Sequence, residues 1–80
     1  MGYMLYVMGN SLYTIEHRKL IEKLKSVRME LGLTQVQVST LLKKPQSYVS
    51  KIERGERRIE AIELGKFANI YKKDISSFIK

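Results

Sequence analysis

Four polar side chains in the middle of the chain have the chemistry needed to read base edges in double-stranded DNA. They are Gln46, Ser47, Ser50 and Lys51. A glutamine amide can pair bidentately with adenine, a lysine ammonium can donate to guanine O6 and N7, and serine hydroxyls can serve either base. These side chains stand beside an expected helix start and a basic loop, which favours DNA contact over a merely solvated helix face.

Basic residues surround this stretch. Residues 34–58 carry six Lys or Arg and two Glu, so most of the formal charge of +7 lies in this middle segment. Such an excess favours a polyanion, either nucleic acid or an anionic membrane surface. The only continuous apolar stretch, Tyr3 to Met8, is far shorter than the ~20 residues of a membrane span. We therefore expect no membrane span. The four polar side chains beside the basic residues favour double-stranded DNA, and not a membrane, as the partner.

Helix signals along the chain place these side chains on the third of five expected helices. Gly32 suits the end of a first helix, and Thr34 with Gln37 forms a capping box. Pro45 suits the first turn of a new helix, and Gly55 ends it. Five helices are expected: from a cap at Thr14 to about Leu31, from Thr34 to about Leu42, from Pro45 to Arg54, from about Glu60 onward, and a last turn capped by Asp74.

Apolar residues at helical spacing predict a single core in an all-α domain. The expected core residues are Leu20, Leu24, Val27, Leu31, Val49, Ile52, Ile62, Leu64, Phe67, Ala68, Tyr71, Ile75, Phe78 and Ile79. We expect a helix-turn-helix domain over residues 14–80, preceded by an N-terminal arm or tail over residues 1–13. The apolar part of residues 1–13 would form a frayed tail, a cover over the core, or an arm that pairs across a dimer, and we favour the arm.

Several function classes are disfavoured by what the chain contains. With no cysteine, there are no disulfides, thiolate metal sites or cysteine nucleophiles, and the core suits a reducing cytoplasm. The single histidine, His17, is expected to be a surface or capping residue, so we expect no metal site and no cofactor. Paired carboxylates, a nucleophile with its base, and a phosphate-cradling glycine loop are all missing, so we do not expect an enzyme.

The motif in this segment resembles a known family. The stretch from Leu31 to Gln35, followed by Pro45 to Arg58 with its core Ser50-Lys51-Ile52-Glu53-Arg54-Gly55, is similar to the XRE family of lambda-repressor-like (Cro/CI-type) domains. The resemblance covers roughly residues 17–79. It implies a compact five-helix domain that binds a partly palindromic operator as a homodimer.

The resemblance also assigns roles to individual residues. It puts Gln35 against phosphate. It places four side chains at the base edges: Gln46, Ser47, Ser50 and Lys51. It implies a buried or half-buried ion pair between Arg28 and Glu53 that links the first helix to the third. With the basic flanks, the expected DNA backbone contacts are Gln35, Lys43, Lys44, Tyr48, Arg54, Arg57 and Arg58.

The chain departs from the family pattern at a few positions. Lys43 and Lys72 stand where relatives often have glycine, and Pro45 replaces the usual polar cap. Val36 and Leu41 replace polar residues, which suggests exposed apolar groups and a weakly supported partner surface. Tyr48 has two open interpretations: it packs on the sugar-phosphate backbone, or it lies over the junction with the fourth helix.

The function expected from these observations is sequence-specific regulation of transcription, as a repressor. One alternative in the same class is an accessory regulator, such as an antitoxin with a toxin partner or the controller of a restriction-modification system. Another class is a protein-interaction module that keeps the helix-turn-helix fold without binding DNA. Acidic or apolar residues on the third helix would favour that module, and this chain has the reverse.

Overall fold

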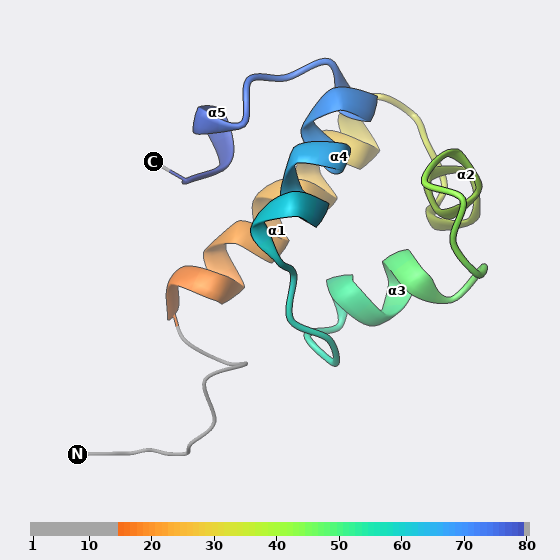
Figure 1. Ribbon diagram of the computed structural model, residues 1–80, viewed down its shortest axis with the longest axis horizontal. Coiled ribbons are helices and arrows are strands. Elements are labelled where there is room, and N and C mark those ends of the chain that lie inside the picture. The colour runs from red at the N-terminus through yellow and green to blue at the C-terminus, as the bar shows by residue number, and fades with distance from the viewer. Residues whose placement is uncertain (1–14, 80) are drawn as a thin grey trace.

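The computed structural model describes residues 15–79, and in this range the chain forms five helices and no strand (Figure 1). Their bounds are α1 (Ile15–Glu30), α2 (Gln35–Leu41), α3 (Tyr48–Glu53), α4 (Ala61–Tyr71) and α5 (Ser76–Ile79). The expected all-α, five-helix fold is confirmed. The expected N-terminal arm, the cap at Thr14 and the side chain of Ile79 lie outside the described residues.

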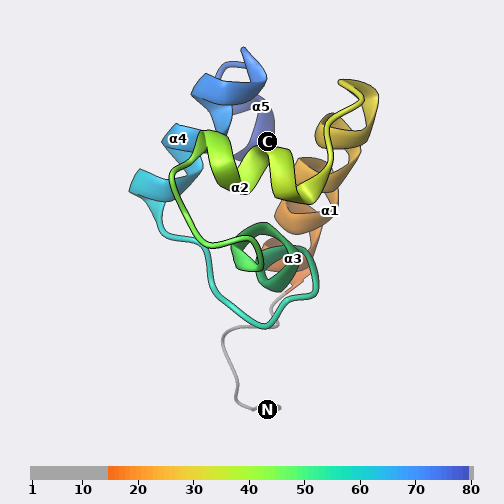
Figure 2. The same cartoon turned by 90° about the vertical axis from the view of Figure 1, so that its right-hand side faces the viewer.

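The helices enclose one core. In Figure 2, α2 lies across the molecule with α3 below it, α1 on one side and α4 on the other. The α1 helix packs against α3, α4 and α5, and α2 packs against α3. The core aromatic rings form a row in which Phe67 lies 6.4 Å from Tyr48 and 5.9 Å from Tyr71. Fully burying side chains of this size stabilises a fold by about 1.5 to 3 kcal/mol each.

Four helices end in the same hydrogen-bonded turn. A residue with a positive φ follows each helix, two residues after its last residue at Gly32 (70°), Lys43 (61°) and Gly55 (78°), and directly after it at Lys72 (58°). In each turn, two backbone N–H groups donate to carbonyls of the last helical turn, as in the 2.9 Å bond from Lys44 to the Ser39 carbonyl. The two lysines therefore adopt the same left-handed backbone conformation as Gly32 and Gly55.

The expected capping groups begin the short helices. Thr34 Oγ1 accepts a 3.0 Å hydrogen bond from the Gln37 amide, and Gln37 Oε1 accepts one of 2.8 Å from the Thr34 amide, so the predicted capping box is confirmed. Asp74 Oδ1 accepts from the amide of Ser76 at 3.1 Å, as expected of the residue that begins α5. Local sequence therefore decides where these helices begin.

The third helix is shorter than predicted. Instead of running from Pro45 to Arg54, it begins at Tyr48, and Gln46 and Ser47 lie in the turn before it. The Tyr48 amide donates to the Pro45 carbonyl over three residues, and the Gln46 carbonyl accepts from the Ser39 hydroxyl at 3.3 Å. The chain is thus held as a turn until Ser47, because contacts with α2 engage the backbone there.

Three residues expected in the core are exposed instead. Leu31 is 47% exposed, Ile62 76% and Ile75 40%. On α4 the buried residues Leu64, Phe67, Ala68 and Tyr71 follow the helical spacing, and Ile62 lies outside that face because it precedes the first of them by only two residues. Leu31 and Ile75 lie just outside the helices, where the chain turns at the surface. Of the other expected core residues in the described range, Leu20 is half-buried and the rest are buried.

Candidate nucleic-acid interface

Of the four side chains expected to read bases, Gln46 and Ser47 lie in the turn that leads into α3, and Ser50 and Lys51 lie on α3 itself. Gln46, Ser47 and Lys51 are exposed, and Ser50 is half-buried. The Ser50 hydroxyl donates to the Ser47 carbonyl at 3.4 Å, a long bond that leaves its oxygen able to accept. Together they form a polar surface at the N-terminal end of α3, on the second helix of a helix-turn-helix unit.

The turn between α2 and α3 is held by Ser39, a residue that the sequence analysis did not single out. Ser39 is fully buried. Its hydroxyl accepts from the Val49 amide at 3.2 Å and donates to the Gln46 carbonyl at 3.3 Å. This one hydroxyl therefore sets the position of the first turn of α3 relative to α2. A serine among apolar residues of a short helix was the only available signal.

A second link holds the C-terminal end of α3 to α1. Arg28 and Glu53 form a bidentate ion pair with nitrogen-to-oxygen distances of 2.7 and 3.0 Å. Their side chains are 11% and 4% exposed. Arg28 also donates to the Leu33 carbonyl at 2.8 Å, and its hydrogen bond to Glu53 raises its pKa. The pair expected from the family resemblance is therefore present, in a buried position.

Gln35, expected at phosphate, takes part in this link. Its Nε2 donates to Glu53 Oε1 at 2.9 Å, and the side chain is half-buried. Glu53 thereby bridges the ends of three segments: α1, the start of α2 and α3. The Gln35 amide nitrogen is thus engaged inside the protein.

A third group of polar side chains gathers at the N-terminal end of α3. The Tyr48 hydroxyl donates to Glu63 Oε2 at 2.8 Å, and Arg57 Nη2 pairs with the same oxygen. Lys44 Nζ and the Arg57 guanidinium each lie 5.3 Å from the centre of the Tyr48 ring. Tyr48 itself is buried and stacks on Phe67 of α4. Of its two open interpretations, the structure shows the position over the junction with α4.

Glu63 is charged at neutral pH in this setting. Burial raises its pKa, but hydrogen bonds from the Glu60 amide, Tyr48 and Arg57 outweigh burial, so the net pKa is lowered. The hydrogen bond to Glu63 likewise raises the pKa of Arg57. For Tyr48, burial is the largest cause of a raised pKa, so its hydroxyl stays protonated and acts as a donor. The sequence analysis missed Glu63, whose only signal was its place three residues after Glu60.

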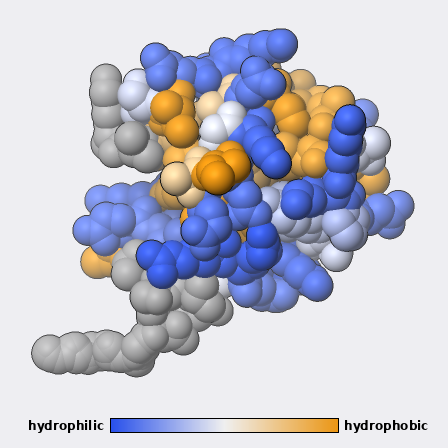
Figure 3. Space-filling view, viewed as in Figure 1, coloured by the Kyte–Doolittle hydropathy of each residue, from blue (hydrophilic) through white to orange (hydrophobic). Residues whose placement is uncertain are grey.

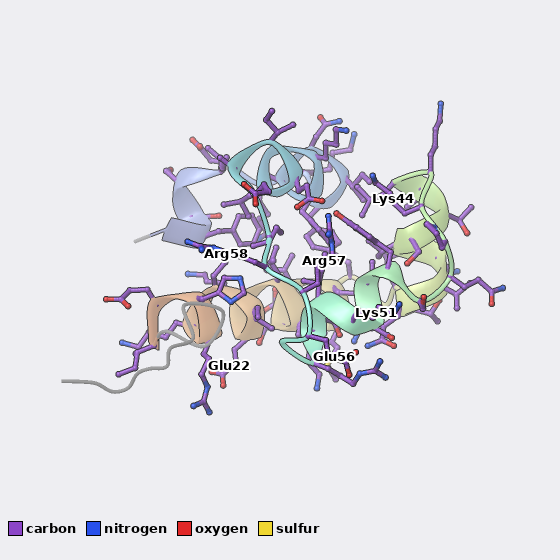
Figure 4. All side chains as sticks on the ribbon, turned by 60° about the horizontal axis from the view of Figure 1, so that its bottom comes forward. Glu22, Lys44, Lys51, Glu56, Arg57 and Arg58 are labelled. Carbon is purple, nitrogen blue, oxygen red and sulfur yellow. The ribbon has the colours of Figure 1, made fainter. Side chains whose placement is uncertain are left out.

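The remaining basic residues expected at DNA have different surroundings. Arg54 is exposed and forms a 2.8 Å ion pair with exposed Glu56. Arg58 is also exposed, in the loop between α3 and α4. Lys43 is exposed and lines a groove of about 250 Å³ between α2 and α4 together with Lys66 and Ile70. Figure 4 shows Lys44 and Arg57 on the side of α3 that faces α4, and Lys51 and Glu56 away from that side.

Apolar groups also reach the surface. Val36 is 47% exposed and Leu41 55%, as their departure from the family pattern suggested. In the face shown in Figure 3, hydrophilic side chains predominate and hydrophobic atoms are exposed in patches, one of them between α4 and α2. His17 is half-buried, and its Nε2 accepts from the Ile59 amide at 3.3 Å, so it links α1 to the loop before α4.

Two searches of the described residues bear on other classes of site. Within residues 15–79, no three His, Cys, Asp or Glu side chains are grouped so that they could hold a metal ion. In the same range, every helix is too short or too polar to span a bilayer.

Comparison with known proteins agrees with this geometry. The model of the helix-turn-helix family HTH_3 matches residues 24–78, from the middle of α1 to α5. No curated protein sequence matches the chain. The matched range includes the two short helices, the exposed polar side chains at the start of α3 and the basic residues around them.

Proposed function

The chain belongs to the helix-turn-helix family HTH_3, the XRE-type DNA-binding regulators, and we propose that it represses transcription as a homodimer on a partly palindromic operator. The start of α3 enters the major groove in this proposal, and Gln46, Ser47, Ser50 and Lys51 contact base edges. Such a regulator acts where the DNA is, in the cytoplasm of a prokaryotic cell.

The observation that supports the proposal best is the exposed polar surface at the N-terminal end of α3. Its side chains carry donors and acceptors and no carboxylate, whereas the opposite face of the helix is buried through Val49 and Ile52. A rigid helix with one buried and one polar face can present its polar groups in a fixed arrangement. That is the requirement for reading a base sequence, since bidentate contacts need aligned groups.

Backbone contacts position the domain in this proposal. Lys44, Arg54, Arg57 and Arg58 are exposed around α3, where phosphates on either side of the major groove would lie. Gln35 and Lys43 belong to the same expected set; Lys43 is exposed, whereas the Gln35 amide nitrogen is bound to Glu53. Tyr48 contributes through the cations that lie on its ring, since the ring itself is buried.

A dimer follows from the size of the reading surface. Four base-reading side chains specify only a few base pairs, and a symmetric pair of domains doubles the site. The exposed Val36 and Leu41 offer apolar area for a partner, either a second copy or a different protein such as a toxin. Measuring the number of chains on the selected duplex by sedimentation tests the dimer, and one chain per duplex would contradict it.

The experiment for the proposed function is selection from a pool of random duplexes at two salt concentrations. The wild type is compared with the double variant Gln46→Ala/Lys51→Ala, whose altered side chains are both exposed. We expect the wild type to enrich a partly palindromic sequence, and the variant to lose that enrichment while keeping salt-sensitive background binding. Lys25→Ala, which removes the same charge from the exposed side of α1, is the matched control and should keep the enrichment.

The rival function makes a different prediction in the same experiment. A helix-turn-helix module that binds only protein enriches no sequence, and its affinity for duplexes tracks salt alone or vanishes. That outcome would reject the regulator and direct the search to a protein partner.

A further inference from the structure

Two basic residues from separate parts of the chain are held against one aromatic ring. Lys44 precedes α3 and Arg57 follows it, yet each cationic group lies 5.3 Å from the centre of the Tyr48 ring. Cations are attracted to the face of an aromatic ring, and the attraction grows where water is partly excluded. Two positive charges therefore share one aromatic ring as a neighbour.

The ring is itself fixed in place. Tyr48 is 8% exposed, stacks on Phe67 and donates its hydroxyl proton to Glu63. Glu63 also accepts hydrogen bonds from Arg57 Nη2 and from the Glu60 amide at 2.9 Å. The Arg57 guanidinium is thus held at two points, by the ring and by the Glu63 carboxylate.

These contacts leave binding capacity on both cations. A guanidinium has five N–H donors, and Glu63 engages Arg57 through Nη2. The Arg57 side chain is 43% exposed, and Lys44 is exposed as well. Lys44, Arg57 and Glu63 together carry one net positive charge, which matches the single negative charge of a phosphodiester.

We propose that Lys44 and Arg57 together bind one phosphodiester of the DNA backbone, and that Glu63 is the positioning residue that holds Arg57 for this contact. The inference rests on the proposed function, since it requires that the chain binds DNA. It adds two things to that function. One phosphate is bound by two cations that share one ring, and an acidic residue, which by charge alone would oppose DNA binding, supports it.

The proposal can be separated from simple charge effects because the chain offers a matched acidic residue. Glu56 also pairs with an arginine, Arg54, but both side chains are exposed. Figure 4 shows Glu56 away from the side of α3 on which Lys44 and Arg57 lie. Glu63→Gln and Glu56→Gln each remove one negative charge near the proposed DNA surface. If charge alone mattered, both variants would bind DNA more tightly. If Glu63 positions Arg57, the two variants change affinity in opposite directions.

The experiment measures binding of the full chain to a fluorescent duplex of arbitrary sequence over a series of salt concentrations. Phosphate contacts are independent of base sequence, so no operator is needed. We expect Glu63→Gln to weaken binding by about threefold at moderate salt, with a salt slope lower by about 0.9, the value for one lost phosphate contact. Glu56→Gln should bind as tightly as the wild type or more tightly, with its slope unchanged.

A double-mutant cycle shows whether Glu63 acts through Arg57. Arg57→Gln alone should lower affinity and slope at least as much as Glu63→Gln, and it tests the phosphate contact even if Glu63→Gln folds poorly. In the Arg57→Gln background, Glu63→Gln should cause no further loss. Thermal melts of all variants establish that binding is measured on folded protein.

Two results would overturn the inference. The first is a Glu63→Gln variant that binds more tightly, as Glu56→Gln does, because Glu63 would then only neutralise Arg57. The second is an Arg57→Gln variant whose salt slope equals that of the wild type. A wild type with no salt-dependent binding to any duplex would reject the proposed function itself, and the inference with it, so the two failures are distinguishable.

Discussion

The two ends of α3 are held by networks of opposite character. At its C-terminal end, Glu53 is 4% exposed and binds Arg28 of α1, and the following Gly55 is buried. At its N-terminal end, Tyr48 and Arg57 meet on Glu63 of α4, with the cations open to solvent. The C-terminal end of α3 is therefore anchored to α1, and the N-terminal end presents positive charge to solvent.

The two networks differ in how many arginine N–H groups remain able to bind an external anion. Arg28 donates hydrogen bonds to Glu53 and to the Leu33 carbonyl, inside the protein. A buried ion pair is costly to desolvate, so its two members depend on each other for compensation. Arg57 has a single carboxylate partner and an exposed side chain, which leaves donors for an external anion. The buried network is therefore expected to affect stability most, and the exposed one DNA binding.

The largest expected effect on stability comes from breaking the buried ion pair at the C-terminal end of α3. Glu53→Ala leaves the Arg28 charge buried without its partner and should lower the free energy of unfolding by about 3 to 5 kcal/mol. Urea denaturation and thermal melting measure the loss. Glu56→Ala, which breaks the exposed pair with Arg54, is the control and should cost about 1 kcal/mol or less. An unchanged melting curve for Glu53→Ala would show that the buried pair does not anchor α3.

A smaller, pH-dependent effect on the free energy of unfolding is expected from Glu63, at the N-terminal end of α3. The folded-state pKa of Glu63 is lowered by its hydrogen bonds, so its contribution to stability is present above its unfolded pKa, ordinarily 4.5. That contribution is lost as the pH falls through the lowered folded-state pKa. Glu63→Gln should therefore be less stable than the wild type by about 1 to 2 kcal/mol at neutral pH.

The gap between wild type and Glu63→Gln should close in acid, because the protonated wild-type carboxyl then resembles the amide. Urea denaturation at neutral pH and at several values below 4.5 measures the gap. Glu56→Gln should show little gap at either pH, since its pair is exposed. A gap for Glu63→Gln that stays constant with pH would mean that packing, and not the charge, is lost.

The smallest expected effect concerns the turn that leads into α3. Lys43 has a φ of 61°, a conformation that costs a residue with a Cβ atom about 1 to 2 kcal/mol, whereas Gly55 at the other end avoids this cost. Lys43→Gly should raise the free energy of unfolding by about 0.5 to 1 kcal/mol, after the greater freedom of glycine in the unfolded chain is counted.

Lys43→Ala separates the backbone effect from the charge. Alanine keeps the Cβ atom, so this variant should show no gain in urea denaturation. Lys72→Gly, at the corresponding position after α4, should show a gain of similar size because its φ is 58°. Equal stability of the glycine and alanine variants at position 43 would show that the positive φ carries no measurable strain.

Most of the fold could be predicted from local signals in the sequence. The family motif, the capping box from Thr34 to Gln37 and the positive φ of Gly32 and Gly55 all depend on neighbouring residues. Spacing also predicted most core residues of α1 and α4. The error at Ile62 arose because an apolar residue near a periodic face was counted as part of it, and one residue of helix rotates a side chain by about 100°.

The candidate site was predictable in part. The sequence indicated which polar and basic side chains surround α3, because their types and the family motif are local. It did not indicate that Ser39 determines the turn or that Glu63 holds Arg57, since these contacts join residues that are apart along the chain. It also placed the start of α3 too early, because contacts with α2 decide where the turn ends.

The sequence by itself determined most helix ends, though not the start of α3, together with the class of fold and the excess of positive charge around α3. Caps, glycines and lysines act where they stand in the chain. Only the tertiary structure decided which cations are engaged inside the protein and which retain donors for a partner. Arg28 and Arg57 are the same residue type, and their burial and partners differ because packing brings Glu53 and Glu63 to them from different helices. Charge is a property of composition, but the availability of a charge depends on what the fold places beside it.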